Sequence, residues 1–218
     1  MILKNKIYII VGIGTDIGKT FLLEKICLKF KKNAMPVNAI KPIISGFDGE
    51  DLLSDSAKIL QIFDKDLTKN HFDDISPWRF KEPVSPNFAA RKEGKNIDFR
   101  EVINFCRKKI DASNDLDQFL FIESAGGVMT PITDDKTFLD LITELKIPVL
   151  LLGSNYLGAI SHSLCAIEAL KSRDIVPELV IINNYPDSSL DISQTKFAIN
   201  NISKVNTLDI DDFMHQLS

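Results

Sequence analysis

The stretch GIGTDIGKT, residues 12–20, decides the fold of this chain. A short apolar run precedes it and a helix-like segment follows, so its glycines lie at a strand-to-helix turn. The usual phosphate-binding loop, G-x-x-x-x-G-K-[ST], would place its first glycine at the position of Ile13. The glycines fall instead at Gly12, Gly14 and Gly18. The stretch is therefore either a nucleotide site with one additional residue or a chance match.

The chemistry of this stretch favours a nucleotide site. A triphosphate requires backbone N–H donors, a cation and a ligand for its metal ion. Glycines allow the N–H groups of the loop to turn inward, Lys19 can reach the β- and γ-phosphates, and Thr20 can offer its hydroxyl to Mg²⁺ at a helix N-terminus. A glycine-rich turn that binds nothing would not require the Gly-Lys-Thr triplet. We therefore expect a nucleotide to bind there.

Apolar runs alternate with helix-period segments along the chain. The expected strands are at 6–12, 37–41, 118–123, 148–153 and 178–183, and the expected helices are near 18–32, 54–62, 99–110, 136–145, 159–173 and 193–202. Most of these strands are apolar at successive residues, which is typical of strands covered on both faces. We predict a single α/β domain over residues 1–218, of the P-loop NTPase type, with a doubly wound, mainly parallel sheet and helices on both faces.

The composition excludes several classes of partner. The chain has 218 residues, with 26 Lys and Arg against 30 Asp and Glu, and its net charge is −4. This balance gives no broad attraction to nucleic acid or to an anionic membrane. The apolar runs are far below the roughly 20 residues that span a bilayer, and the one near the N-terminus is too short for a signal peptide. We expect a cytoplasmic protein with no nucleic acid or membrane partner.

Two further expectations concern the cysteines and one irregular stretch of the sequence. Cys27, Cys106 and Cys165 lie far apart in apolar, helix-like segments, so we expect buried, reduced thiols rather than disulfides or metal ligands. The irregular stretch 64–98 holds three of the nine prolines and the only tryptophan. Its aromatic and apolar content favours an ordered functional loop over a disordered segment.

Charged side chains stand near the ends of the second and third expected strands. Lys41 ends the second and Glu123 ends the third, and the carboxyl ends of parallel strands are where ligands gather. Lys41 is either an edge residue that reaches water or a positioned cation. Asp55, which opens the next helix, is either a helix cap or surface group or a ligand of Mg²⁺. Glu123 indicates a functional role more clearly than Lys41 or Asp55, because its strand is otherwise apolar.

Taken together, these residues resemble the dethiobiotin synthetase family, whose members close a ureido ring on 7,8-diaminopelargonate with CO₂ and ATP. The family's phosphate loop, G-T-D-T-E-V-G-K-T, has the same length as residues 12–20. Other stretches similar to family motifs cover most of the chain: KPIISG (41–46), SDSAKIL (54–60), PVSPNFAARKEG (83–94), ESAGGVMTPIT (123–133), IPVLLLGSNYLGAISHSLCAIEAL (147–170) and IINN (181–184). The additional loop residue is thus a trait of the family.

The resemblance implies a set of nucleotide ligands. ATP would be held by the phosphate loop, two acids, the SAGG stretch and two asparagines that read the adenine edge: Asp16, Ile17, Gly18, Lys19, Thr20, Phe21, Asp55, Glu123, Ser124, Ala125, Gly126, Asn183 and Asn184. Mg²⁺ would lie among Thr20, Asp55 and Glu123. Lys19 would contact the transferred phosphoryl group.

The resemblance also implies a site for the diamine. Lys41 would be the catalytic residue, which steadies the carbamate and the phosphoryl group that passes to it, and Ser45 would hydrogen-bond the carbamate. The family forms homodimers in which the substrate carboxylate meets a helix N-terminus of the second subunit. The loop PVSPN (83–87) would close over the diamine. The substrate-binding residues would then be Thr15, Lys41, Ser45, Gly158, Ala159, Ile160 and Ser161.

Several positions depart from the family pattern. Gly14 and Asp16 stand where the family usually has Asp and Glu, Ser124 replaces a glycine, and Asn87 replaces a histidine. The C-terminal stretch 204–213 lacks the family's G-x-I-P segment, which leaves the preference for a nucleotide base open. Two alternatives are another P-loop ATPase or amidoligase and a non-catalytic nucleotide-binding protein. Neither explains why the motifs around the expected diamine site are kept.

Overall fold

The computed structural model describes residues 2–47, 54–185, 188 and 190–217. Its strands are β1 (Ile7–Gly12), β2 (Val37–Ile40), β3 (Ile43–Ser45), β4 (Trp78–Phe80), β5 (Phe119–Gly127), β6 (Val149–Ser154), β7 (Leu179–Asn183) and β8 (Thr207–Asp209). Its helices are α1 (Lys19–Lys32), α2 (Asp55–Ile62), α3 (Lys69–Ile75), α4 (Pro86–Lys92), α5 (Phe99–Asp115), α6 (Phe138–Leu145), α7 (Ala159–Lys171), α8 (Ile192–Ser203) and α9 (Ile210–Gln216). Within these ranges, no helix has both the length and the apolar composition needed to cross a bilayer.

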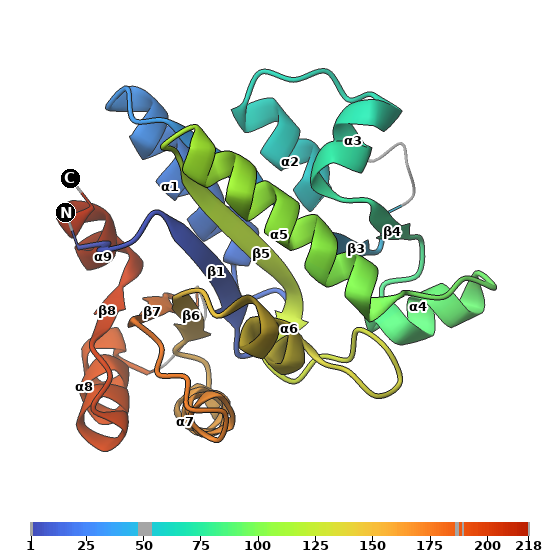
Figure 1. Cartoon of the computed structure of the whole chain (residues 1–218). Coiled ribbons are helices and arrows are strands. Elements are labelled where there is room, and N and C mark those ends of the chain that lie inside the picture. The colour runs from blue at the N-terminus through green and yellow to red at the C-terminus, as the bar shows by residue number, and fades with distance from the viewer. Residues whose placement is uncertain (1, 48–53, 186–187, 189, 218) are drawn as a thin grey trace.

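The main sheet has the strand order β2-β5-β1-β6-β7-β8, and every neighbouring pair in it is parallel. In Figure 1, α1 lies behind the sheet, while α5 and α6 lie in front of it. Helices therefore cover both faces, which explains why all residues of β1 and β6 are buried. The predicted doubly wound α/β fold is confirmed.

Two details differ from the sequence-based expectation. β5 runs on to Gly127, so the prediction that Glu123 ends its strand is wrong. The strand continues because Gly127 still pairs with Gly12 of β1 after a shift in register. The stretch 64–98, expected as an ordered loop, contains α3, β4 and α4, and β4 pairs with β3 beside the main sheet.

The cysteines are reduced, but only two of them are buried. Cys27 and Cys106 lie in the core, and burial raises the pKa of each thiol to about 12, so both stay protonated. Cys165 is exposed, which makes the prediction wrong for this residue. The reason is its position off the inward-packing repeat of α7, which consists of Ala159, Ser163, Ile167 and Leu170.

Tyr8 joins the start of the chain to the segment before β7. It is fully buried, and its hydroxyl accepts hydrogen bonds from the backbone N–H groups of Lys4 and Asn5 at 2.9 and 3.0 Å. The hydroxyl donates in turn to Glu178 Oε1 at 2.8 Å. Burial, together with the neighbouring Glu178 carboxylate, raises the pKa of Tyr8 from 10.0 to about 12.

Replacing Tyr8 by phenylalanine should lower the free energy of unfolding by about 1–3 kcal/mol at neutral pH. The Asn5 N–H loses its acceptor, the Lys4 N–H keeps only a 3.4 Å contact with Glu178 Oε1, and Glu178 loses the donated hydrogen bond. The pKa of Tyr8 is higher in the folded state, so the hydroxyl contributes fully below pH 10.0 and loses this contribution as the pH rises to about 12. Denaturant titrations should therefore show the difference between wild type and variant shrinking over this range. Tyr185→Phe, at an exposed tyrosine, is the control. A difference that does not change with pH would contradict this account.

Candidate functional site

A cleft of about 750 Å³ lies at the carboxyl edge of the main sheet. Most of the predicted site residues line it, namely Thr15, Asp16, Gly18, Lys19, Thr20, Phe21, Lys41, Ser45, Asp55, Glu123, Ala125 and Gly126. The others do not line it, namely Ile17, Ser124, Gly158, Ala159, Ile160, Ser161, Asn183 and Asn184. The ends of β1, β2 and β5 thus bring together the residues that the sequence places there.

The phosphate loop ends in a backbone conformation that favours glycine. Gly18 has φ +94° and is the N-terminal cap residue of α1. The side chain of Lys19 folds back over the loop, and its Nζ donates to the Gly14 carbonyl at 3.0 Å. Burial lowers the pKa of Lys19 to about 8, although Glu123 opposes this effect. Phosphates bound in the loop would favour the charged form of this lysine.

Lys41 lies between two carboxylates in the cleft. Its ammonium donates to Glu123 Oε1 at 2.7 Å and also to Asp55 Oδ2. Thr20 Oγ1 donates to the same Glu123 oxygen at 2.8 Å. Burial alone would lower the pKa of Lys41, but Glu123 and Asp55 outweigh it and hold the pKa above its usual value. The four residues form one charged cluster in which Lys41 keeps its proton.

This geometry answers two questions that the sequence leaves open. Lys41 is only 5% exposed, so it is a positioned cation and not an edge residue that reaches water. Asp55 does not cap α2, because the cap is Ser54, whose Oγ accepts from the Ala57 N–H at 3.2 Å. Burial tends to raise the pKa of Asp55, but Lys41 outweighs it and the pKa is lowered. Asp55 therefore presents a charged carboxylate to the cleft.

The carboxylate of Glu123 fits a magnesium ion that is bound with a nucleotide. Its Oε2 atom is buried without a hydrogen-bond partner, an unfavourable state that a ligand would relieve. In the part of the chain that the structure describes, no group of three or more His, Cys, Asp or Glu could hold a metal by itself. Mg²⁺ beside phosphates needs only one or two carboxylates, with the rest of its shell from phosphate oxygens and water. Thr20, Asp55 and Glu123 match this requirement.

Ser45 is a second polar group in the cleft without a partner. It is the last residue of β3, and its buried Oγ makes no hydrogen bond. The small sheet of β3 and β4 holds it there. Sequence pattern alone did not reveal this position, because a strand of three residues has too little periodicity to detect. A polar substrate group would satisfy the hydroxyl.

The serine that replaces a family glycine is accommodated inside the protein. Ser124 is fully buried and does not line the cleft, and its Oγ donates to the Gly126 carbonyl at 3.2 Å. The following turn is held by Thr130, whose Oγ1 accepts from the Gly127 N–H at 2.8 Å. Thr130 lines the cleft as well, although it was not among the predicted site residues.

The predicted adenine ligands lie on the other side of β1 from Lys41. Asn183 ends β7, and its Nδ2 donates to the Ile17 carbonyl of the phosphate loop at 2.9 Å. Asn184 Oδ1 accepts a hydrogen bond from Asn155 at 2.9 Å. Their contact with a base stays a prediction, as does the role of the residues that begin α7.

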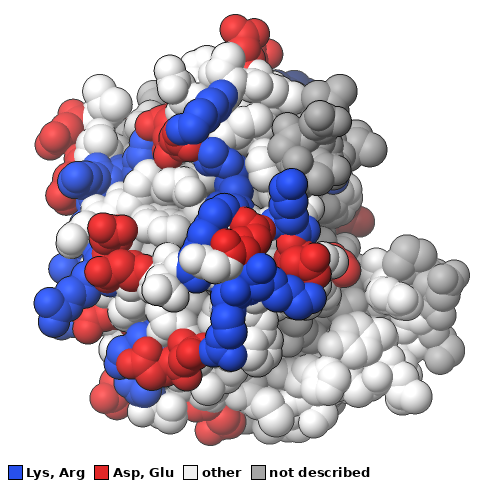
Figure 2. Space-filling model, turned by 90° about the vertical axis from the view of Figure 1, so that its right-hand side faces the viewer, with Lys and Arg blue, Asp and Glu red and all other residues white. Residues whose placement is uncertain are grey.

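The PVSPN stretch borders the cleft from the start of α4. Pro83 to Pro86 line the cleft, whereas Asn87 donates through Nδ2 to Asp134 at 3.1 Å. Asp134 also pairs with Arg91 at 2.5 Å. Figure 2 shows the side of the molecule that carries α4, where Lys and Arg lie interspersed with Asp and Glu. The hydrogen bond between Asn87 and Asp134 connects the PVSPN stretch to the loop after β5.

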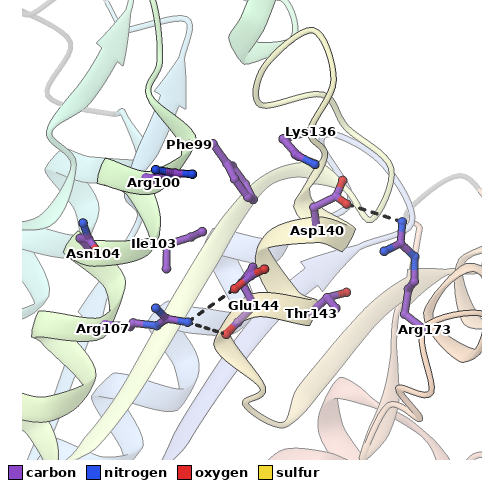
Figure 3. Close-up of a pocket in the computed structure, with 10 residues that line it drawn as sticks. All are labelled: Phe99, Arg100, Ile103, Asn104, Arg107, Lys136, Asp140, Thr143, Glu144 and Arg173. Carbon is purple, nitrogen blue, oxygen red and sulfur yellow. Dashed lines mark hydrogen bonds and ion pairs between the residues drawn. The ribbon is translucent and has the colours of Figure 1, made fainter.

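A second hollow, of about 530 Å³, lies between α5 and α6 (Figure 3). Arg107 contacts the carbonyl of Glu144 at 3.1 Å and its carboxylate at 3.6 Å, and Arg173 lies 3.5 Å from Asp140. None of the predicted site residues lines this hollow. We therefore locate the candidate site in the cleft at the sheet edge.

Comparison with known sequences identifies close relatives. A family model described as an AAA domain matches residues 6–210. The "ATP-dependent dethiobiotin synthetase BioD" of Phenylobacterium zucineum is 38% identical over 83% of this chain and 76% of its own length. The protein of the same name from Acidiphilium cryptum is 32% identical over 87% and 84%, and that from Legionella pneumophila strain Paris is 38% identical over 78% and 76%.

Solved structures agree on the fold. The MinC:MinD cell division protein complex of Aquifex aeolicus matches with a TM-score of 0.57 at 14% identity, over 98% of this chain and 87% of that one. The signal recognition particle receptor FtsY from Elizabethkingia anophelis matches with a TM-score of 0.55 at 12% identity, over 99% and 62%. Identities this low indicate a shared fold alone.

Proposed function

This chain belongs to the dethiobiotin synthetase family, and we propose that its cleft closes the ureido ring of dethiobiotin from 7,8-diaminopelargonate, CO₂ and ATP. It is an ATP-dependent ligase of biotin biosynthesis. The observation that carries the assignment of the site is the buried ammonium of Lys41, which lies between Asp55 and Glu123 and beside the phosphate loop. A fixed cation in this position suits a reaction that joins two anions.

The chemistry requires three steps. One neutral amine of the diamine attacks CO₂, and the resulting carbamate releases a proton. A carbamate oxygen then attacks the γ-phosphorus of ATP, ADP leaves, and a carbamic–phosphoric mixed anhydride forms. The second amine attacks the anhydride carbon and releases a proton, phosphate leaves with the bonding electrons, and the ring closes.

The residues of the cleft match the second step, in which the carbamate and the γ-phosphate must approach each other. Lys19 on the loop and Lys41 after β2 both line the cleft, and their positive charges would reduce the repulsion. Mg²⁺ held by Thr20, Asp55 and Glu123 would neutralise the β- and γ-phosphate oxygens. We assign the unpartnered Oγ of Ser45 to the carbamate. The protein thus acts mainly by positioning and by fixed charge.

We propose that the working form is a cytoplasmic homodimer. Gly158, Ala159, Ile160 and Ser161 of the second subunit would hold the substrate carboxylate at the start of α7, because a helix N-terminus favours an anion. Leu157 is 89% exposed and Met129 is 57% exposed, and apolar side chains of this kind are suited to a subunit interface. Sedimentation of the purified chain tests this, since a species that stays monomeric would contradict it.

The direct test of the function is to incubate the protein with 7,8-diaminopelargonate, bicarbonate, Mg²⁺ and ATP. Dethiobiotin and ADP should appear together in equal amounts, and neither should form without the diamine. ATP hydrolysis that the diamine does not affect would favour another P-loop ATPase. Nucleotide binding without turnover would favour a binding protein. Repeating the assay with other nucleoside triphosphates measures the base preference that the sequence leaves open.

Replacing Ser45 by alanine should reduce dethiobiotin formation by about tenfold, because one hydrogen bond to the carbamate is lost. Its Oγ has no partner in the protein, so the free energy of unfolding should stay the same or rise slightly. Kinetics and thermal unfolding of the same preparation measure both effects. Ser163→Ala removes another buried, unpartnered hydroxyl that lies outside the cleft, and should leave turnover unchanged. Normal turnover in Ser45→Ala would contradict the assignment.

A further inference from the structure

We infer that Asn155 is a positioning residue for the base side of the nucleotide site, an inference that rests on the proposed function of the cleft. The strand order gives the direction of the nucleotide. Its γ-phosphate must meet Lys41 and Glu123 at β2 and β5, which lie on one side of β1. The phosphate loop begins at the end of β1, between the two halves of the sheet. The base end of the nucleotide therefore extends to the other side of β1, over the ends of β6 and β7.

A polar side chain at the end of β7 contacts the phosphate loop, and one at the end of β6 supports it. Asn183 Nδ2 donates to the Ile17 carbonyl at 2.9 Å, and the Ser154 Oγ donates to the Asn183 carbonyl at 3.1 Å. A Cβ on Gly18 would lie only 2.4 Å from Asn183 Nδ2, so the asparagine packs directly on the loop. The contacts that hold the chain after Asn183 therefore determine how far this part of the chain lies from the bound phosphates.

Asn155 holds that part of the chain. It follows β6 and is 1% exposed. Its Nδ2 donates to Asn184 Oδ1 and to the Leu190 carbonyl, both at 2.9 Å. Its Oδ1 accepts from the Tyr185 N–H at 2.6 Å, and its own carbonyl accepts from Ser188 Oγ at 2.6 Å. We call Asn184, Tyr185, Ser188 and Leu190 the post-β7 segment.

These three hydrogen bonds of the Asn155 side chain all go to this segment. A buried amide is unfavourable unless its donors and acceptor are used, and here both of its ends bond to one neighbouring stretch. A nonpolar side chain would fill the same space but would leave the segment without these fixed bonds. Asn155 thus fixes the position of the chain that follows Asn183, on the base side of the site.

The test compares two ligands that both carry phosphates, of which only one carries a base. In Asn155→Ala, the affinity for ADP with Mg²⁺ should fall about tenfold, whereas the affinity for inorganic tripolyphosphate with Mg²⁺ should change less than about twofold. Isothermal titration calorimetry measures both without any ring closure, so the result does not depend on the assigned reaction. In the synthesis assay, the KM for ATP should rise while the KM for the diamine and kcat stay near their wild-type values.

Two further variants separate positioning from general damage. Ser188→Ala removes the bond to the Asn155 carbonyl and the one that Ser188 Oγ accepts from the Leu190 N–H at 3.0 Å, but leaves the bonds of the Asn155 side chain in place. It should weaken ADP binding in the same direction but less. Ser163→Ala, buried on α7 close to β6, should change neither ligand's affinity. Equal weakening of ADP and tripolyphosphate in Asn155→Ala, or no change in ADP affinity, would overturn the inference. Failure of the wild-type protein to make dethiobiotin would instead reject the proposed function.

Discussion

Replacing Lys41 by alanine should lower the rate of dethiobiotin formation by about 10²- to 10³-fold, with ADP affinity changed only a few-fold. In the proposed reaction the cation is needed where the carbamate meets the γ-phosphate, whereas the phosphate loop would bind ADP through its own N–H groups and Lys19. Product formation at saturating ATP and calorimetry with ADP measure the two effects separately. Near-normal product formation would show that Lys41 is not the catalytic residue.

The alanine variant needs a control because Lys41 also neutralises the buried carboxylate of Glu123 and the partly buried carboxylate of Asp55. Removing one partner of a buried ion pair costs about 3–5 kcal/mol of stability, and Glu123 is 1% exposed. Lys41→Arg keeps the positive charge and should retain more of the thermal stability, but its longer planar group cannot place the charge at the same point. Lys41→Arg should therefore be stable and still slow. If its turnover were normal, any cation at this position would suffice.

The fold could be predicted because its central strands are covered on both faces. β1, β5, β6 and β7 appear as continuous apolar runs, and long helices such as α1 lie between them. β8 and α9 could not be predicted in the same way. β8 has three residues, two of them only partly buried, so its pairing with β7 depends on the finished sheet and not on a local pattern.

The cleft could be predicted where polar or charged residues stand next to apolar runs, even though Glu123 lies inside β5 and not at its end. Lys19, Thr20, Lys41 and Glu123 are charged or polar groups beside apolar runs, and the ends of parallel strands meet at one edge. Ser45 was predicted only from the family resemblance, and the positions of Thr130 and Asn155 were not predicted from the sequence. Asn155 bonds to Leu190, which is 35 positions away, and such a contact leaves no mark on local periodicity.

Replacing Gly18 by alanine should reduce the affinity for ADP on the order of 100-fold. Gly18 has φ +94°, a conformation that alanine strongly disfavours, and a Cβ there would lie 2.4 Å from Asn183 Nδ2. The loop would have to shift, which would move the N–H groups at the start of α1 away from the phosphates and separate Asn183 from Ile17.

Gly14→Ala is the matched control in the same loop. Apart from Gly14 itself and its two neighbours in the chain, no heavy atom lies within 4 Å of a Cβ built on Gly14, and its carbonyl, which accepts from Lys19, is kept. Its ADP affinity should therefore stay close to that of the wild type, although the family usually has an acid there. Calorimetry with ADP on both variants gives the comparison. If both lost affinity equally, glycine content rather than the geometry at Gly18 would govern the loop, and the argument from its positive φ would fail.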